Sequence, residues 1–189
     1  MATVAVTGHV RISAGSLAPI RQAVDSVLAR YPADALVGLS CLAEGADALF
    51  AAAVLAAGGR LEVVLPSADY RARMVAPHYA GEFDLLCGAA SAVKVMPYRQ
   101  ASTAAYAAAN RVLLARAQLL VAVWDGLPGG RGGTADTVAA ARTAGLPVEI
   151  VWPPGASRPE PPGRRTPGRR APEAARPRRF SPPAGRARP

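Results

Sequence analysis

A glycine-rich segment at residues 123–136, VWDGLPGGRGGTAD, is the stretch of this sequence best suited to chemistry. It follows an apolar run and precedes a helical pattern, and its glycines let the backbone approach a ligand closely. The free N–H groups of a helix's first turn attract anions. An arginine within the segment adds a cation that can bind phosphate with two parallel hydrogen bonds. We therefore expect a phosphate-binding loop formed by Gly129, Gly130, Arg131, Gly132, Gly133 and Thr134, with Gly126 as a further ligand-binding residue.

A flexible glycine-rich surface loop would have a similar composition. If the segment is such a loop, Thr134 only caps the next helix. The segment is not a Walker A loop, because no Lys followed by Ser or Thr ends it, and it is not a GxGxxG motif. Its place between an expected strand and an expected helix favours phosphate binding.

A second polar segment, Thr7-Gly8-His9, follows the first expected strand. Gly8 would let the backbone pass close to a ligand, and His9 could hydrogen-bond a phosphate or a ribose. A tight turn with an exposed histidine explains these residues equally well.

Carboxylates mark a third segment and the end of the fifth expected strand. Glu44, Gly45 and Asp47 stand where a helix begins, and Asp125 ends the strand. These side chains could bind ribose hydroxyls, as acidic residues do at other nucleotide-binding strands. Capping of a helix by acidic residues is the alternative for Glu44 and Asp47.

Aromatic and basic residues follow the third and fourth expected strands, and one asparagine interrupts a long helical pattern. Each could stack on a base or contact the ligand, although a solvated surface is the commoner role of such residues. They are Tyr70, Arg71, Arg73, Tyr98, Arg99 and Asn110.

Short apolar runs alternate with longer helical patterns over the first 154 residues. The expected strands are 3–6, 35–39, 61–65, 92–96, 119–124 and 148–152, and the longer expected helices are 17–30, 46–57, 81–90, 102–117 and 134–144. This alternation predicts an α/β fold, a Rossmann-like three-layer sandwich with a mostly parallel sheet of about six strands. In such sheets, ligands bind where loops leave the carboxyl ends of the strands.

Charge divides the chain at about residue 154. Residues 155–189 hold ten arginines against two glutamates, so they carry +8 of the net +9, together with nine of the 18 prolines. We expect a Rossmann-like domain at 1–154 and a disordered Pro/Arg-rich tail at 155–189. A basic nucleic-acid-binding body is excluded. The tail could make weak nucleic-acid contacts, or it could simply keep the chain in solution.

Other classes are disfavoured by the sequence. No apolar run is long enough for a membrane helix, and no signal peptide is visible. Two separated cysteines and two histidines predict no disulfide framework and no metal site. We expect a cytoplasmic protein that needs no metal or other cofactor. The Ala-rich helices would allow close packing between two copies, so a homodimer is compatible with the sequence.

The order of these segments resembles the SLOG superfamily. The matching residues are TGH (7–9), AEGAD (43–47), VVLP (63–66), VAVWDG (121–126), PGGRGGTAD (128–136) and PVEIVWP (147–153). This group includes the LOG (lysine decarboxylase-like) nucleotide phosphoribohydrolases, DprA-type proteins and the ligand-sensing modules of TRPM channels. The resemblance covers residues 1–154. It implies a Rossmann-like domain that binds a nucleotide, such as a nucleoside monophosphate, or an ADP-ribose-like ligand.

The glycine segment departs from the LOG motif PGGxGTxxE. It has one extra residue between PGG and GT, and Thr137 stands where the motif has its catalytic Glu. One residue turns a helical side chain by about 100°, so Asp136 is not a simple substitute. Three hypotheses follow: a nucleotide-binding module, a nucleotide N-glycosidase or transferase that uses Glu44, Asp125 or Asp136, and a nucleic-acid-associated module that uses the tail.

Overall fold

The structure is a computed structural model, and it describes residues 1–130 and 132–159. Arg131 and residues 160–189 lie outside the described part, and with them nearly all of the tail expected from residue 155. Strands and helices alternate along the chain: β1 (Ala2–Gly8), α1 (Ala14–Leu28), η1 (Ala33–Ala35), β2 (Leu36–Ser40), α2 (Ala46–Ala56), β3 (Arg60–Leu65), α3 (Tyr70–Arg73), α4 (Ala80–Ala89), β4 (Ala92–Val95), α5 (Thr103–Arg116), β5 (Leu119–Val123), α6 (Thr134–Thr143) and β6 (Val148–Ile150).

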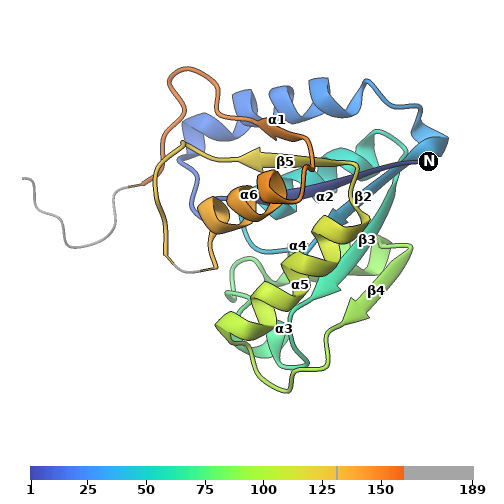
Figure 1. Cartoon of the computed structure of the whole chain (residues 1–189), viewed down its shortest axis with the longest axis vertical. Coiled ribbons are helices and arrows are strands. Elements are labelled where there is room, and N and C mark those ends of the chain that lie inside the picture. The colour runs from blue at the N-terminus through green and yellow to red at the C-terminus, as the bar shows by residue number, and fades with distance from the viewer. Residues whose placement is uncertain (131, 160–189) are drawn as a thin grey trace, which may run out of the picture. The chain divides into compact units, whose positions relative to one another are not determined.

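The strands of the described part form one sheet in the order β4-β3-β2-β1-β5-β6. Every pair in it is parallel, so the sheet is wholly parallel where the sequence predicted a mostly parallel one. Figure 1 shows helices on both sides of the sheet. The α/β class and the six strands predicted from the sequence are confirmed.

Apolar side chains fill both faces of the sheet. Helices α1 and α2 pack on one face, α5 and α6 pack on the other, and α3 and α4 extend the first layer over β3. All five residues of β5 are buried, which agrees with the continuous apolar sequence of this strand. The strand lies next to the edge strand β6, however, and β1 and β2 occupy the centre.

Element boundaries differ from the expected ones at both ends of the domain. Helix α1 begins at Ala14, three residues before the expected start, and Pro19 therefore lies inside the helix. Strand β6 ends at Ile150, although the backbone N–H of Val151 still donates to the carbonyl of Ala122 (2.8 Å).

The chain turns to opposite faces of the sheet after β1 and after β5. Strand β1 lies between β2 and β5, and it is followed by α1 on one face while β5 is followed by α6 on the other. Loops that diverge in this way open a crevice at the carboxyl ends of parallel strands. The fold thus brings the loops after β1, β2 and β5 to one edge.

The segment after β6 returns to the start of α1. The backbone N–H of Ser157 donates to Oγ of Ser16 (2.9 Å), and the N–H of Ser13 donates to the carbonyl of Ser157 (3.0 Å). The contacts of the folded part therefore reach past residue 154, as far as Arg158.

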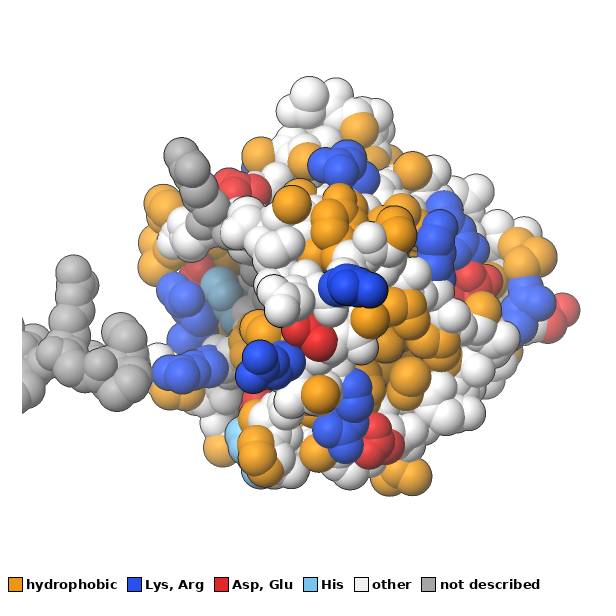
Figure 2. Space-filling view, turned by 90° about the horizontal axis from the view of Figure 1, so that it is seen from below, with side chains coloured by type: hydrophobic (Ala, Val, Ile, Leu, Met, Phe, Trp, Pro, Cys, Tyr) orange, Lys and Arg blue, Asp and Glu red, His pale blue; other side chains and the backbone are white. Residues whose placement is uncertain are grey.

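Several surface charges within the described residues form ion pairs. Arg21 binds Asp25 on α1, Arg71 binds Asp84 on α4, and Arg116 binds Glu62 on β3. Figure 2 shows one face of the molecule, on which basic side chains are scattered among apolar and acidic ones. Among the described residues, no helix combines the length and apolarity needed to cross a membrane.

Gly38 lets α2 lie close to the sheet, and this contact gives a first test of the fold. A Cβ at Gly38 would lie 2.5 Å from Val54 and 3.1 Å from Phe50. We expect Gly38→Ala to lower the free energy of unfolding by about 1–3 kcal/mol, because the core would be overpacked. The control is Gly88→Ala on the exposed side of α4, which has open space around it. It should raise stability by up to about 1 kcal/mol. Urea unfolding measures both, and equal effects would contradict the packing described.

Candidate functional site

A cavity of about 540 Å³ opens at the carboxyl ends of the strands. This volume is within the range of small-molecule sites. Most of the residues predicted from the sequence line it: Thr7, Gly8, His9, Glu44, Asp47, Gly129, Gly130, Gly132, Gly133 and Thr134. Four others lie close by in the same loops but outside the lining, namely Gly45, Asp125, Gly126 and Asp136. Arg131 lies outside the described residues.

The buried carboxylate of Asp47 organises the loop between β2 and α2. Its Oδ2 accepts hydrogen bonds from Oγ of Ser40 (3.1 Å) and from the backbone N–H groups of Cys41 (3.1 Å) and Ala43 (3.4 Å). Burial raises the pKa of Asp47 to about 6, and these hydrogen bonds offset only part of the cost of burial. The loop carries backbone strain at Leu42, a buried residue with φ of +52°.

The second carboxylate oxygen of Asp47 is open to the cavity. No described group hydrogen-bonds Oδ1, and no buried polar side-chain atom of the described part lacks a partner, so this oxygen reaches solvent. Asp47 itself is 7% exposed and lines the cavity. A nearly buried acceptor with one free oxygen is suited to a ligand hydroxyl or amine.

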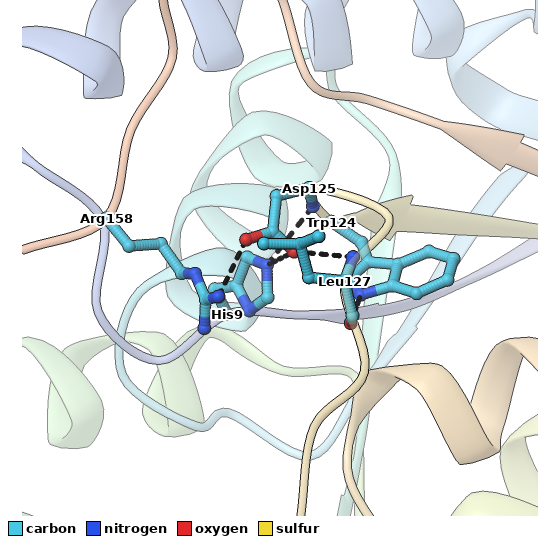
Figure 3. A network of polar contacts seen from close by, with 5 residues as sticks. All are labelled: His9, Trp124, Asp125, Leu127 and Arg158. Atoms are coloured by element: carbon cyan, nitrogen blue, oxygen red, sulfur yellow. Dashed lines mark hydrogen bonds and ion pairs between the residues drawn. The ribbon is translucent and has the colours of Figure 1, made fainter. Parts of the chain in front are cut away.

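His9, Asp125 and Arg158 form a polar cluster at the edge of the cavity (Figure 3). Asp125 Oδ1 lies 2.9 Å from Nε2 of His9 and accepts from the backbone N–H of Leu127 (3.1 Å), while its Oδ2 pairs with Arg158 (2.7 Å). The ring of His9 meets Trp152 edge-on, with centroids 5.3 Å apart. Asp125 therefore holds the histidine, the arginine and the start of the glycine segment together.

Electrostatics follow from this packing. Burial lowers the pKa of His9 below its ordinary value, although Asp125 acts to raise it. Burial alone would raise the pKa of Asp125, but the Leu127 N–H, His9 and Arg158 together lower it below its ordinary value. At neutral pH the pair is thus a neutral imidazole beside an ionised carboxylate.

The glycine segment is closed by its own hydrogen bonds at the start of α6. Asp136 Oδ2 accepts from the backbone N–H of Gly132 (2.7 Å), and the N–H of Gly133 donates to the carbonyl of Gly130 (3.0 Å). Thr134 and Ala135 line the cavity and belong to the first turn of α6, whose N–H groups have no partner within the helix. This end of the cavity is suited to an anion.

Comparison with known proteins supports the architecture. The comparison with protein-family models found no match, and neither did the comparison with curated proteins. Among solved structures, the DNA processing protein DprA from Streptococcus pneumoniae matches with a TM-score of 0.58 and 19% identity, over 79% of this chain and 50% of that one. The chain therefore spans about half the length of DprA.

Two further structures match over more of their own length. The structural genomics target TM1055 matches with a TM-score of 0.52 and 20% identity, over 78% of this chain and 72% of that one. The molybdenum cofactor binding protein of Rippkaea orientalis matches with a TM-score of 0.51 and 18% identity, over 79% and 75%. All three neighbours are SLOG-fold proteins. The chain shares the fold of these three proteins. The resemblance seen in the sequence is confirmed at this level.

Thr137, which stands where the LOG motif has its glutamate, is buried and makes hydrogen bonds within the protein. Thr137 is 5% exposed; its Oγ1 donates to the carbonyl of Gly133 (3.1 Å) and accepts from Nδ2 of Asn110 (3.0 Å). The asparagine that interrupts the helical pattern of α5 thus braces the glycine segment, and it lines the cavity as well.

The remaining candidates from the sequence take different places. Glu44 lines the cavity and pairs with His78 (2.8 Å) at the surface, and Tyr70 lines it from α3. Arg71 instead binds Asp84 over the ring of Phe83. Arg73, Tyr98 and Arg99 are not part of the lining.

Among the lining residues that the sequence analysis missed, three carry aromatic or charged side chains. Tyr106 comes from α5, Trp124 from the end of β5 and Arg158 from the segment after β6. A signal existed only for Trp124, which is the last residue of the strand expected at 119–124 and lies within the glycine-rich segment at 123–136. The described residues include no group of three or more His, Cys, Asp or Glu side chains that could hold a metal ion.

The raised pKa of Asp47 predicts a pH-dependent stability. An acid whose pKa rises from 3.8 to about 6 on folding stabilises the protein fully below pH 4, and this stability is lost as the pH rises through about 6. Asp47→Asn keeps an oxygen for the three hydrogen bonds and removes the charge. We expect the variant to exceed the wild type by up to about 3 kcal/mol at pH 7.5, and to match it near pH 4. Urea unfolding at both pH values measures this, and a pH-independent difference would contradict it.

Proposed function

We propose that this SLOG-fold domain binds a nucleotide or nucleotide-derived ligand, of the nucleoside monophosphate or ADP-ribose-like class, in the cavity described above. One observation carries the proposal: a single cavity of about 540 Å³ joins the first turn of α6, the open oxygen of Asp47 and the side chains of Tyr106 and Trp124. These features match the three parts of a nucleotide, which are an anionic phosphate, a hydroxyl-bearing sugar and a flat base.

The phosphate would lie against Gly129–Thr134. Thr134 and Ala135 line the cavity in the first turn of α6, whose backbone N–H groups could donate to the phosphate, and the partial positive charge of the α6 N-terminus would add to this attraction. The glycines at 129 and 130 have open space where a Cβ would be, so nothing blocks a close approach. The phosphate-binding role predicted from the sequence remains our proposal.

The sugar and the base would occupy the side of the cavity formed by α2, α5 and Trp124. Asp47 Oδ1 can accept a hydrogen bond from a ribose hydroxyl, because the other oxygen already holds the loop. Tyr106 and Trp124 offer aromatic faces for stacking, which is worth about 1–3 kcal/mol for each base in other proteins.

Binding is favoured over hydrolysis of an N-glycosidic bond by Glu44, Asp125 or Asp136, the three carboxylates that the sequence analysis put forward as catalytic groups. A catalytic carboxylate must be free to take a proton or to steady a developing positive charge. Glu44 is paired with His78, Asp125 with His9 and Arg158, and Asp136 with the N–H of Gly132. The molybdenum cofactor binding protein of Rippkaea orientalis illustrates that a protein with this fold can be named for binding rather than for catalysis.

The nucleic-acid hypothesis rests on residues outside the described part. DprA is named as a DNA processing protein, but this chain spans only half of it. The arginines of residues 160–189 would supply salt-sensitive attraction to phosphates. This role stays a prediction from composition.

A ligand panel tests the proposal directly. The full chain is heated with AMP, CMP, GMP, UMP, ADP-ribose, cyclic nucleotides or NAD, and the same samples are then analysed by chromatography. A ligand at about 100 times its Kd should stabilise the fold by roughly 2.7 kcal/mol. A shift with intact ligand supports a binding module, whereas release of base or ribose phosphate supports the glycosidase. No shift with any of them would overturn the proposed function.

The backbone at residue 134 provides a test of the phosphate loop. Thr134 is the first residue of α6, where proline is favoured, and Gly133 has the extended conformation that precedes proline. Thr134→Pro therefore removes one N–H without disturbing the helix. We expect it to weaken the binding of the nucleoside monophosphate that binds the wild type most tightly at least fivefold, with little change in thermal stability. The control, Thr134→Ala, keeps the N–H and should bind more tightly than Thr134→Pro. Equal affinities of Thr134→Pro and the wild type would place the phosphate elsewhere.

A further inference from the structure

Arg158 is delivered to the cavity by the last described segment of the chain. Its neighbour Ser157 is held at the start of α1 by hydrogen bonds to Ser13 and Ser16, so the backbone beside Arg158 is fixed. The side chain lines the cavity and is 38% exposed, and its guanidinium pairs with Asp125 (2.7 Å). Figure 3 shows it reaching toward Asp125 beside the ring of His9.

Among the described lining residues, Arg158 is the one side chain with a permanent positive charge. The other ionisable groups that shape the cavity's charge at neutral pH are the carboxylates of Glu44 and Asp47 and the weakly basic His9. An anionic ligand therefore meets two sources of attraction, the first turn of α6 and this guanidinium. Guanidinium groups bind phosphoryl and carboxylate oxygens with paired hydrogen bonds.

Arg158 can leave its ion pair with Asp125 at little cost. Asp125 Oδ1 has its own partners in His9 and Leu127, so the loss of Arg158 leaves only Oδ2 to be hydrated. A partly exposed ion pair is weak in water. The long arginine side chain can thus turn from Asp125 to a ligand while its backbone stays in place.

We propose that Arg158 selects ligands with an anionic phosphoryl group by moving from Asp125 to that group, and that Asp125 positions the arginine and competes for it. The inference rests on the proposed function, because it names the ligand class for the same cavity. It places the recognition of charge on a residue beyond the last strand. A neutral nucleoside would leave Arg158 on Asp125 and would gain nothing from it.

Calorimetry with AMP, adenosine and inorganic pyrophosphate tests the role of Arg158 in the full chain. Arg158→Gln should weaken the binding of AMP and of pyrophosphate at least tenfold, since a hydrogen bond between charged groups is lost. The affinity for adenosine should not change. Arg158→Lys keeps the charge and should recover part of the affinity. The matched control is Arg116→Gln, which removes a similarly exposed arginine that pairs with Glu62 on β3 and does not line the cavity. It should change none of the three affinities.

Asp125→Asn tests the competition with an effect of the opposite sign. The amide oxygen can still accept from Leu127, whereas the amide NH2 group facing Arg158 no longer attracts it. We expect AMP and pyrophosphate to bind about two- to fivefold more tightly than to the wild type. If Asp125→Asn weakens the binding of both ligands as Arg158→Gln does, Asp125 and Arg158 act together in holding the ligand. The proposed competition for the arginine is then overturned.

The outcomes separate this inference from the proposed function. If AMP binds the wild type and Arg158→Gln equally well, the inference fails and nucleotide binding stands. If pyrophosphate binds in an Arg158-dependent way while no nucleotide binds, the inference stands as an anion site and the proposed function fails. If neither pyrophosphate nor any nucleotide of the panel binds the wild type, both are overturned.

Discussion

The carboxylate of Asp47 is buried at the start of α2, where one oxygen accepts hydrogen bonds from three groups of the β2–α2 loop. The loop it fixes includes a strained Leu42 and ends at Gly45, whose φ of +84° brings the loop against the carbonyls of His9 and Val10. A side chain at Gly45 would collide with that backbone. The position of the β1–α1 loop thus depends on the β2–α2 loop, and so on one buried charge.

This dependence continues across the sheet to the glycine segment. The loop after β1 positions His9, whose ring contacts the carboxylate of Asp125. Asp125 in turn accepts a hydrogen bond from the backbone N–H of Leu127. Burying a carboxylate is unfavourable unless it is hydrogen-bonded. Asp47, whose pKa is raised, therefore fixes its loop at some expense of stability at neutral pH, whereas the lowered pKa of Asp125 shows that its partners more than compensate for its burial.

Much of this arrangement was predictable from the sequence because parallel strands bring their carboxyl ends to one edge. That rule alone placed Thr7, Glu44, Asp47 and the glycines in one cavity. It could not say which way a carboxylate points: Asp125 and Asp136 lie in the right loops, yet both face their own backbone and neighbours instead of the cavity. Side-chain direction depends on turn geometry that residue types do not specify.

Arg158 was beyond prediction for a different reason. Its surroundings in the sequence are Pro- and Arg-rich, and composition assigns such a stretch to a disordered tail. Its neighbour Ser157 is held by hydrogen bonds with Ser13 and Ser16, about 140 residues earlier in the chain, and nothing local signals them. Tyr106 is similar, because it reaches the cavity only through the packing of α5.

Thr137 stands where the LOG motif has its glutamate, and its side chain is buried. A glutamate at this position would place a charge in a site that is 5% exposed, where Asn110 and the carbonyl of Gly133 already satisfy the hydroxyl. The one-residue difference from the LOG motif precedes α6 and leaves the helix N-terminus at the cavity. It does not give the neighbouring Asp136 the missing role, because that side chain closes the loop on Gly132. The first turn of α6 thus lines the cavity, whereas Thr137, at the position of the LOG glutamate, makes hydrogen bonds within the protein.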